Sequence, residues 1–374
     1  LSISTRNPAV IQHCIFANNS CTNYGGAIYI NPNAQNTQTL MEKCIIDNCT
    51  FECNYVHATS NEEGQVIFIE TNPDIGDTLI DIDNCTFLNN VYESNKAYLI
   101  HSKAPFFELS NSTIEFTDIT KSAGFLKLVK GNNRIDNITV LRSTSSRITY
   151  GLSVYIDTGT TSSFENCDFI ECGNNIRSFT IHDNGADTSF NNCNFTYNKS
   201  DDNIKSQVID IRSYTIHSIT NCAISHSKTY DAGAIRFVPE TVYHTSLTIQ
   251  NLIVDDAQLQ SDRALFNFHF KSINESNTNI NNITIKNCII PDGCLISLKC
   301  DQASNFTFNE FKYYNNSVCA SFGGGAGLWL VFPSGDNDNL SYVDFTNCIF
   351  DQNQAIPKDA SSNGNNYYGY GGGT

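Results

Sequence analysis

Short segments of this chain alternate apolar and polar residues, and the alternation reverses phase at an asparagine. The segment Ile80–Phe87 reads IDIDNCTF, so isoleucine holds every second position before Asn84, and Cys85 and Phe87 then hold the apolar phase. Alternation with a period of two predicts a strand with one buried face, and a one-residue shift sends side chains to the opposite face of a flat strand. We therefore expect a corner at the asparagine, which readily adopts the left-handed conformation.

The same phrase recurs along the chain, each time with an asparagine followed by Cys or another small or apolar residue. These asparagines are Asn84, Asn111, Asn137, Asn166, Asn192, Asn221, Asn251, Asn287 and Asn347. Successive copies from Asn84 to Asn251 lie 26 to 30 residues apart, and the step to Asn287 is 36 residues. A recurring unit of this length indicates a solenoid whose loops vary in length.

A second strand, opened by glycine, lies between the corner phrases. Examples are Gly25–Ile30, Gly151–Ile156, Gly233–Phe237, Gly293–Leu298 and Gly327–Phe332. One flat and one bent strand per repeat predict an all-β fold, a parallel β-helix of roughly twelve coils. Right-handedness follows from the bias of parallel crossovers. We expect residues 1–374 to form a single domain of this kind, an internal section of a longer solenoid, because neither end shows a distinct capping segment.

The repeat predicts two inward stacks. One holds the residues after the asparagines, namely Cys85, Ser112, Ile138, Cys167, Cys193, Cys222, Leu252 and Cys288. The other is a buried ladder of the asparagines themselves, in which each side-chain amide bonds its neighbours in adjacent coils. Cysteines outside the stack allow local pairs, such as Cys49 with Cys53, Cys167 with Cys172 and Cys294 with Cys300, but connectivity cannot be read from sequence. Because Cys-x-x-Cys is absent, we expect no metal site and no cofactor.

Two short motifs resemble those of a known repeat family. Gly25–Ile28 reads GGAI and resembles the GGA[ILV] motif of chlamydial polymorphic outer membrane proteins, and their companion FxxN motif is matched at Phe16–Asn19, Phe51–Asn54, Phe87–Asn90, Phe195–Asn198 and Phe350–Asn353. Similar repeats occur in large surface proteins of trichomonad protists. The resemblance implies a surface-exposed β-helical protein with a role in adhesion. The full GGA[ILV] form occurs once, and Ala232–Ile235 departs from it.

The composition of the chain limits the classes of binding partner. The formal net charge of −16 argues against nucleic acid, whose phosphates require a cationic face. No apolar run is long enough to span a bilayer. Polarity comes mainly from Asn, Ser and Thr, since only 16% of residues are charged. These features favour an extracellular or cell-surface protein.

Glycosylation sequons occur at two kinds of position. Those in predicted loops are the better acceptors, because a sequon requires exposure: Asn18, Asn198, Asn274, Asn315 and Asn339. Those in or near corner phrases are expected to be sheltered: Asn48, Asn84, Asn111, Asn137 and Asn282.

The sequence shows no converging catalytic constellation. Glycoside hydrolysis requires two facing carboxylates, and the candidate pairs are Asp81 with Asp83, Asp255 with Asp256 and Asp201 with Asp202. Each is more simply a solvated strand face or turn. Asp210 with Arg212 and Arg236 is the nearest approach to a lyase site, and charge pairing between strands explains it equally well. We therefore predict that the protein has no catalytic residues and is not an enzyme.

The outward residues of the flat strands form a mixed, moderately aromatic face that suits a glycan or protein ligand. They are Tyr29, His182, Arg212, Arg236, His269, Lys299 and Trp329. Three function classes remain. The first is adhesion or recognition at a cell surface, the second is a structural subunit of an extracellular filament or coat that self-associates, and the third is a polysaccharide lyase or hydrolase. We rank the first two ahead of the enzyme.

Overall fold

The structure is a computed structural model that describes residues 1–4, 7–22, 24–31, 41–56, 66–70, 77–92, 98–116, 124–143, 151–172, 178–183, 187–198, 207–212, 216–229, 233–238, 246–259, 262–270, 278–290, 292–301, 305–318, 327–331 and 342–355. Within these ranges the chain forms strands and turns and no helix. By its internal contacts the chain divides into two compact units, Leu1–Thr188 and Ser189–Thr374.

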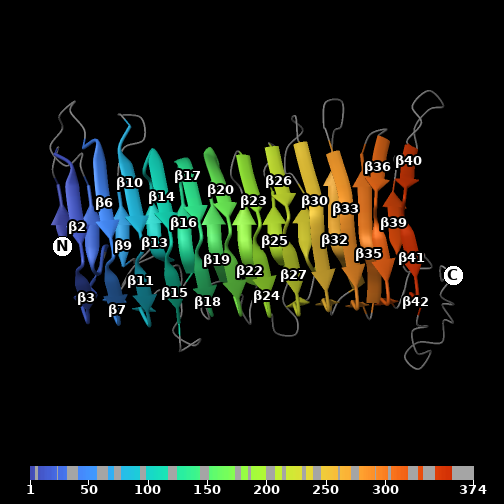
Figure 1. The fold of residues 1–374 in the computed structure, drawn as a ribbon, viewed down its shortest axis with the longest axis horizontal. Helices are drawn as coiled ribbons and strands as arrows, with labels where there is room; N and C mark the ends of the chain where they lie inside the picture. Colours follow the sequence, from blue (N-terminus) through green and yellow to red (C-terminus); the bar gives the residue numbers. More distant parts are fainter. Residues whose placement is uncertain are drawn as a thin grey trace. The chain divides into compact units, whose positions relative to one another are not determined.

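One sheet of the first unit, sheet A, stacks its strands in chain order (Figure 1). Its strands are β1 (Ser2–Ile3), β5 (Ile28–Ile30), β9 (Ile67–Ile69), β13 (Tyr98–Ser102), β16 (Gly124–Leu128), β19 (Gly151–Ile156) and β22 (Ser178–Asp183). Neighbouring strands run parallel, with Tyr29 opposite Phe68 and His101 opposite Lys127. Each strand therefore belongs to a successive turn of the chain.

A second sheet, sheet B, contributes a longer and a shorter strand to each turn. The longer strands of the first unit are β2 (Ala9–Gln12), β6 (Lys43–Asp47), β10 (Leu79–Asp83), β14 (Phe106–Ser110), β17 (Gly131–Asp136) and β20 (Thr160–Glu165). The shorter strands are β3 (Ile15–Ala17), β7 (Thr50–Glu52), β11 (Thr86–Leu88), β15 (Thr113–Glu115), β18 (Thr139–Leu141) and β21 (Asp168–Ile170). A small sheet C adds β4 (Ser20–Cys21), β8 (Tyr55–Val56) and β12 (Val91–Tyr92).

The second unit repeats this plan. Its part of sheet A holds β25 (Gln207–Ile211), β29 (Ile235–Phe237), β32 (Asp262–Phe270), β35 (Asp292–Cys300) and β39 (Leu328–Val331). Its part of sheet B holds β24 (Asn194–Thr196), β26 (Ile216–Thr220), β27 (Ala223–Ser225), β30 (Ser246–Asp255), β33 (Thr278–Lys286), β36 (Asn305–Asn309), β37 (Lys312–Tyr314), β40 (Tyr342–Thr346) and β41 (Ile349–Asp351), and β23 (Asp187–Asn191) begins at the unit boundary. A further sheet D comprises β28 (Lys228–Thr229), β31 (Gln258–Leu259), β34 (Ile289–Ile290), β38 (Ser317–Val318) and β42 (Gln354–Ala355).

The predicted parallel β-solenoid is confirmed in both units. The roughly twelve coils expected of one continuous stack require correction, because about seven turns are shown, with seven strands of sheet A in the first unit and five in the second. The loops that set the repeat length vary, so counting phrases along the sequence did not reveal the division. That residues 1–374 form one domain stays a prediction, as does the right hand of the coil.

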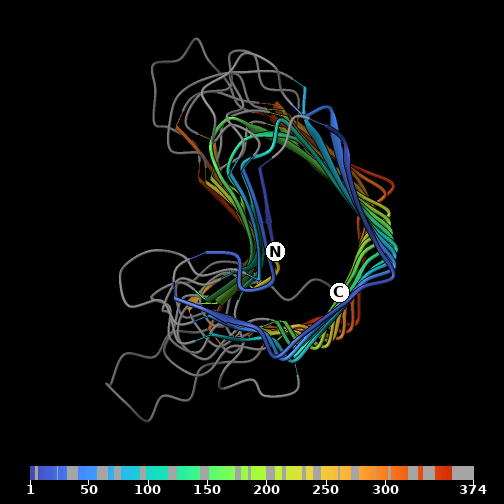
Figure 2. The same ribbon diagram turned by 90° about the vertical axis from the view of Figure 1, so that its left-hand side faces the viewer.

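Two left-handed residues turn the chain in most described coils. The first lies between the long and short strands of sheet B, as at Asn84 (φ 52°), and the second lies five residues later, as at Asn89 (φ 49°). The predicted corner is confirmed, since every asparagine of the expected ladder has a positive φ between 48° and 56°. In the first unit the bend between the strands of sheet B lies on the side of the coil away from sheet A (Figure 2).

The asparagines of the first corner point outward, which contradicts the expected inward stack. Asn84, Asn111 and Asn137 are exposed, whereas the residues on either side alternate normally between buried and half-buried. A left-handed residue between two strands places two consecutive side chains, here Asp83 and Asn84, on the outer surface. Cys85 then returns to the interior, where it is buried.

The predicted inward stack of the residues that follow the first-corner asparagines, here called the inward file, is confirmed within each unit, except for its last member, Cys288. Thr86, Thr113, Thr139 and Asp168 pair in register, so the residues before them stack in the first unit. In the second unit Leu252 pairs with Ile283 and not with Cys288. Asn287 (φ 56°) and Cys288 thus belong to the second corner, and the apparent 36-residue step came from matching the wrong corner of that coil.

Aromatic rings continue these files through the core. Phe16, Phe51 and Phe87 lie in consecutive turns, with centroid separations of 5.1 Å and 4.7 Å and nearly parallel planes. Phe51 and Phe87 are fully buried, and burying such a side chain contributes about 1.5–3 kcal/mol. The stacked core fixes the register on which every surface file depends.

Candidate functional site

A second asparagine ladder, which the sequence pattern did not reveal, lies inside the coils. It is formed by the residue after the second corner, which is the asparagine of the FxxN motif. The Asn54 side chain donates to Asn90 Oδ1 at 3.0 Å and to the Phe16 carbonyl at 2.8 Å, and the Asn54 backbone N–H also donates to Asn90 Oδ1, at 3.0 Å. In the second unit Asn316 repeats this with Asn353. The buried ladder therefore exists, but at other residues than those predicted.

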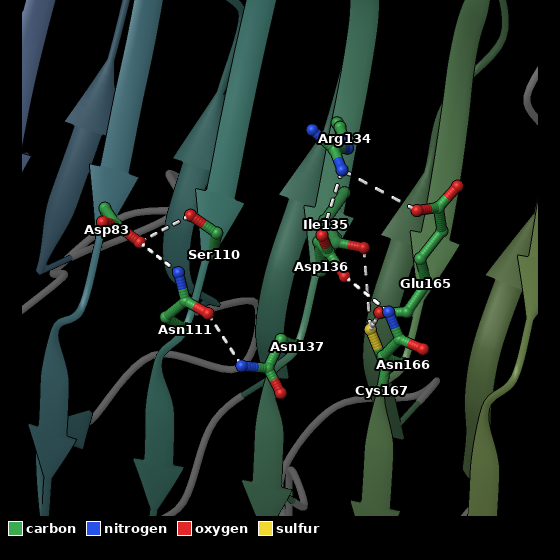
Figure 3. Close-up of polar contacts among 10 residues, drawn as sticks. All are labelled: Asp83, Ser110, Asn111, Arg134, Ile135, Asp136, Asn137, Glu165, Asn166 and Cys167. Carbon is green, nitrogen blue, oxygen red and sulfur yellow. Dashed lines mark hydrogen bonds and ion pairs between the residues drawn. The ribbon is translucent and has the colours of Figure 1, made fainter.

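The first-corner asparagines form an exposed ladder instead (Figure 3). In the first unit Asn137 donates to Asn111 Oδ1 at 2.7 Å, and Asn111 donates to Asp83 Oδ1 at 2.7 Å. Asn166 turns to Asp136, at 2.9 Å. The bonds between coils were predicted, and their place on the surface was not.

The second unit carries the same exposed ladder. Asn221 donates to Asn191, Asn251 donates to Asn221, and Asn282 donates to Asn251, at 2.7 to 2.9 Å. Asn347 makes a long contact of 3.4 Å with Asn309, whereas Asn287, at the second corner, bonds Asp255. Asn192 is exposed at its corner (φ 54°).

The acidic pairs do not face one another across a groove. Asp81 forms an ion pair with Lys43 at 2.9 Å, while Asp83 accepts hydrogen bonds from Ser110 and Asn111. Asp201 and Asp202 lie outside the described residues. Each described carboxylate of this strand is thus bound to an adjacent coil.

Asp255 and Asp256 diverge as well. Asp255 pairs with Lys286 at 2.9 Å and Asp256 with His226 at 2.8 Å. Partial burial opposes ionisation of Asp255, but hydrogen bonds from Lys286 and Asn287 outweigh it and hold its pKa below the ordinary value. A carboxyl with a lowered pKa is a poor proton donor near neutral pH.

Asp210 sits between two arginines on sheet A of the second unit. Its carboxylate is fully buried and lies 2.8 Å from both Arg212 Nε and Arg236. Two bonded guanidiniums satisfy the carboxylate oxygens. Each carboxylate oxygen thus has a guanidinium partner, and the contact with Arg236 matches the pairing between strands that the sequence allowed.

The outer face of sheet A in the first unit gathers aromatic and charged side chains. One file across five consecutive strands comprises Tyr29, Phe68, His101, Lys127 and Tyr155. At a strand spacing of about 4.8 Å it extends over roughly 19 Å. We call it the aromatic file. Phe68 and His101 are buried, whereas the other three are half-buried.

Ring contacts hold the aromatic file together. Tyr24 stacks on Phe68 with centroids 4.6 Å apart, and His101 makes a T-shaped contact with Phe68, with centroids 5.0 Å apart. Lys103 lies 5.2 Å from the centre of the Phe68 ring, and Lys127 lies 5.5 Å from that of Tyr155. Such cation–π contacts contribute about 0.5–1 kcal/mol at exposed sites and fix the direction of the ammonium group.

A polar file runs beside it, two residues further along each strand. The Tyr29 hydroxyl donates to Glu70 at 2.6 Å and accepts from Asn31 at 2.9 Å, and Glu70 also faces Lys103 at 3.8 Å. Partial burial and then the Glu70 hydrogen bond raise the pKa of Tyr29. Asp157 accepts a weak hydrogen bond from Tyr155. The face thus combines ring surfaces with fixed donors and acceptors.

The predicted outward residues divide between these two kinds of file. Tyr29 and Arg236 occupy the file nearest the strand centre, while Arg212, His269 and Lys299 occupy the next one. His269 and Lys299 both contact Asp301. The side chains of His182 and Trp329 lie outside the described residues. Phe68 and His101 were missed, because the glycine that marked other flat strands does not open β9 and β13. Lys127 was missed although β16 begins with Gly124.

The three suggested cysteine pairs are not formed. Cys294 and Cys300 lie on the same strand, β35, six residues and about 20 Å apart, whereas a disulfide requires Cα atoms within about 7 Å. Cys49 is buried and Cys53 is exposed at the second corner. Cys167 and Cys172 lie at opposite ends of β21.

The loop sequons divide into three groups. Asn18 and Asn315 are exposed. Asn198 is 2% exposed and its Nδ2 is shielded from solvent, so the folded chain contradicts its expected role as an acceptor. It holds the inward FxxN position, which explains the burial. Asn274 and Asn339 lie outside the described residues.

Over the described residues no helix is long and apolar enough to cross a membrane. In the same part of the chain no three His, Cys, Asp or Glu side chains group in a way that would hold a metal ion. The absence of a metal and of a cofactor stays a prediction. Comparison with protein-family models, with curated proteins and with solved structures gave no match.

Proposed function

We propose that the protein is an extracellular or cell-surface recognition protein, and that the aromatic file with its polar neighbours binds a carbohydrate chain. The observation that carries the proposal is the in-register file of Tyr29, Lys127 and Tyr155 on one sheet face. A ligand with a repeated structure matches a surface that repeats at every strand.

The chemistry of this face suits a sugar. Ring faces stack against the apolar side of a sugar, and fixed polar groups orient its hydroxyls, a combination typical of small-molecule sites. Glu70 contacts both the Tyr29 hydroxyl and Lys103. The Lys103 side chain is 34% exposed and that of Glu70 is 42% exposed, so both can reach a ligand. Their mutual contacts reduce the ordering needed on binding.

Further features support an extracellular role. Sequons, low charge density and the resemblance to β-helical surface proteins favour it. We infer a right-handed coil from the bias of parallel crossovers. Among the described residues, the acids considered for catalysis, Asp81, Asp83, Asp255 and Asp256, are bound to neighbouring groups, which supports a role in binding and not in turnover.

Glycan-array binding of the full chain tests the proposal. We expect binding to a subset of neutral or sialylated cell-surface glycans, lowered at least tenfold by Lys127→Ala and by Tyr155→Ala. Tyr197→Ala is the matched control, because Tyr197 is an exposed tyrosine at a corner of the second unit. Its binding should equal that of the unmodified chain.

Thermal unfolding of each variant separates lost contacts from lost folding. Tyr155 packs against Tyr98, so Lys127→Ala is the cleaner variant. Unchanged glycan binding by a folded Lys127→Ala and Tyr155→Ala double variant would contradict the assignment of this face. Binding to no glycan on the array would contradict the ligand class.

A further inference from the structure

Four consecutive turns of the first unit present the same triplet at the same exposed corner. Asn48, Asn84, Asn111 and Asn137 are each followed two residues later by threonine, namely Thr50, Thr86, Thr113 and Thr139. These triplets fit the N-glycosylation acceptor pattern. The four threonines pair in register across adjacent short strands, so the triplets form one file.

The backbone directs these asparagines to solvent. Each has a φ of 48° to 52° and is exposed. Their backbone amides donate to carbonyl oxygens of the next turn, as from Asn84 to Ser110 at 3.1 Å and from Asn111 to Asp136 at 3.1 Å. The corner is therefore anchored by main-chain bonds that do not involve the side-chain amide.

The exposed ladder leaves one amide proton on each bonded side chain for modification. A carboxamide nitrogen carries two protons. Asn111 and Asn137 each use one in the bond to the preceding turn, to Asp83 and to Asn111 respectively. A glycan replaces one proton and leaves the other, so the ladder bond and the glycan are compatible.

We propose that this corner carries a file of N-linked glycans, on the side of the coil away from sheet A (Figure 2). In the transfer, Nδ2 bonds to the anomeric carbon of an oligosaccharide carried on a lipid pyrophosphate. The bond from that carbon to the phosphate oxygen breaks, the lipid pyrophosphate leaves, and one amide proton is lost. The inference rests on the proposed extracellular location, and it leaves the aromatic file uncovered.

The chain supplies its own negative controls. Asn166 holds the same exposed corner, but Asp168 replaces the threonine. Asn198 has a complete sequon and is buried. If the file depends on both the triplet and exposure, neither residue carries a glycan in folded, secreted protein.

The test is site mapping of the full chain secreted from a eukaryotic host behind an added signal sequence. Enzymatic glycan removal in ¹⁸O-labelled water followed by peptide mass spectrometry marks each occupied asparagine. We expect marks at two or more of the four positions and none at Asn166 or Asn198. Thr113→Ala should remove the mark at Asn111, whereas Thr113→Ser should retain it.

Folded secreted protein with none of the four positions marked would overturn the proposal, as would a mark at Asn111 that survives Thr113→Ala. Glycan-array binding of unglycosylated protein from bacteria is measured in parallel. Array binding without marks refutes only the glycan file, and marks without array binding refute only the proposed recognition face.

Discussion

Asn54 uses both ends of its side-chain amide inside the coil. Its Oδ1 accepts from the backbone and side chain of Asn19, and its Nδ2 reaches Asn90 and the Phe16 carbonyl. Asn54 is fully buried, so water cannot reach its amide and these bonds supply its hydrogen-bond partners. A buried donor or acceptor left without a partner costs about 1–3 kcal/mol.

We therefore expect Asn54→Leu to lower the free energy of unfolding by about 1–3 kcal/mol or more, because the partners in both adjacent turns lose their bonds. Chemical denaturation of the full chain measures this. The matched control is Asn84→Gly at the exposed corner, where glycine accepts the positive φ; its effect should stay within about 0.5 kcal/mol. An equal loss for both variants would refute the distinction between the two ladders.

Buried thiols give a prediction with a pH dependence. Burial raises the pKa of Cys44 from 9.0 to about 11. A raised pKa means that the fold favours the neutral thiol, so this stabilisation is complete below pH 9 and is lost as the pH rises toward 11. The unfolding free energy of Cys44→Ala should fall less steeply between pH 9 and pH 11 than that of the unmodified chain. Identical slopes would contradict the assignment.

Thiol labelling at pH 8 tests the same burial directly. Cys53 is exposed, whereas Cys85 is buried and its pKa is raised to about 12, first by burial. Because the thiolate is the reactive form, a thiol reagent should modify Cys53 quickly in the native chain and Cys85 only after unfolding. Peptide mass spectrometry distinguishes the two sites. Rapid labelling of Cys85 in folded protein would refute the inward file.

At the scale of strands and corners, the sequence predicted the kind of turn better than its direction. The phase change around Asn84 correctly indicated a left-handed residue, because no flat strand can bury both Ile82 and Cys85. The direction of the asparagine side chain followed from the backbone at the corner, which alternation alone does not contain. The second corner is occupied by residues such as Arg142 and Glu171. These residue types have no preference for the left-handed conformation, so the sequence does not indicate this corner.

The sequence also misplaced one coil and did not reveal the aromatic file. Asn282–Ile283 and Asn287–Cys288 lie five residues apart and look alike, and only strand pairing identifies the first as the partner of Asn251–Leu252. The aromatic file joins Tyr29, Phe68 and Tyr155, which lie on strands separated by segments of unequal length. Such proximity depends on register across turns, which the sequence could not supply.

Glycine at the start of a strand can also be tested at this scale. Gly131 begins β17 with φ +86°, and a Cβ there would overlap the carbonyl oxygens of Ala104 and Pro105. Gly159 has a similar φ of +83° with nothing within 4 Å. Gly131→Ala should destabilise by about 2–4 kcal/mol, from overpacking added to the left-handed strain, and Gly159→Ala by only about 1–2 kcal/mol. Equal effects in denaturant unfolding would argue against the close approach.

At the scale of the whole molecule, net charge and the state of its acids bear on the question of catalysis. The formal charge of −16 favours solubility and disfavours polyanionic partners. We expect purified protein to show no lyase or hydrolase turnover on pectin, mucin or chitin-like polymers. Product release measured by reducing-sugar and unsaturated-product assays checks this. Robust turnover abolished by changing a single acidic residue, such as Asp255→Asn, would refute it.

The five-residue interval between the two corners makes the coil a natural display frame. From Asn84 to Asn89 and from Asn166 to Glu171 the interval is the same, while in the first unit the residues from one first corner to the next range from 26 between Asn111 and Asn137 to 36 between Asn48 and Asn84. Added residues are therefore absorbed outside the corner unit, and loop closure becomes only slowly costlier with length. A foreign peptide inserted between β12 and β13 would have a defined position along the stack of coils. The chain could therefore present several epitopes at separations set by the spacing of its strands.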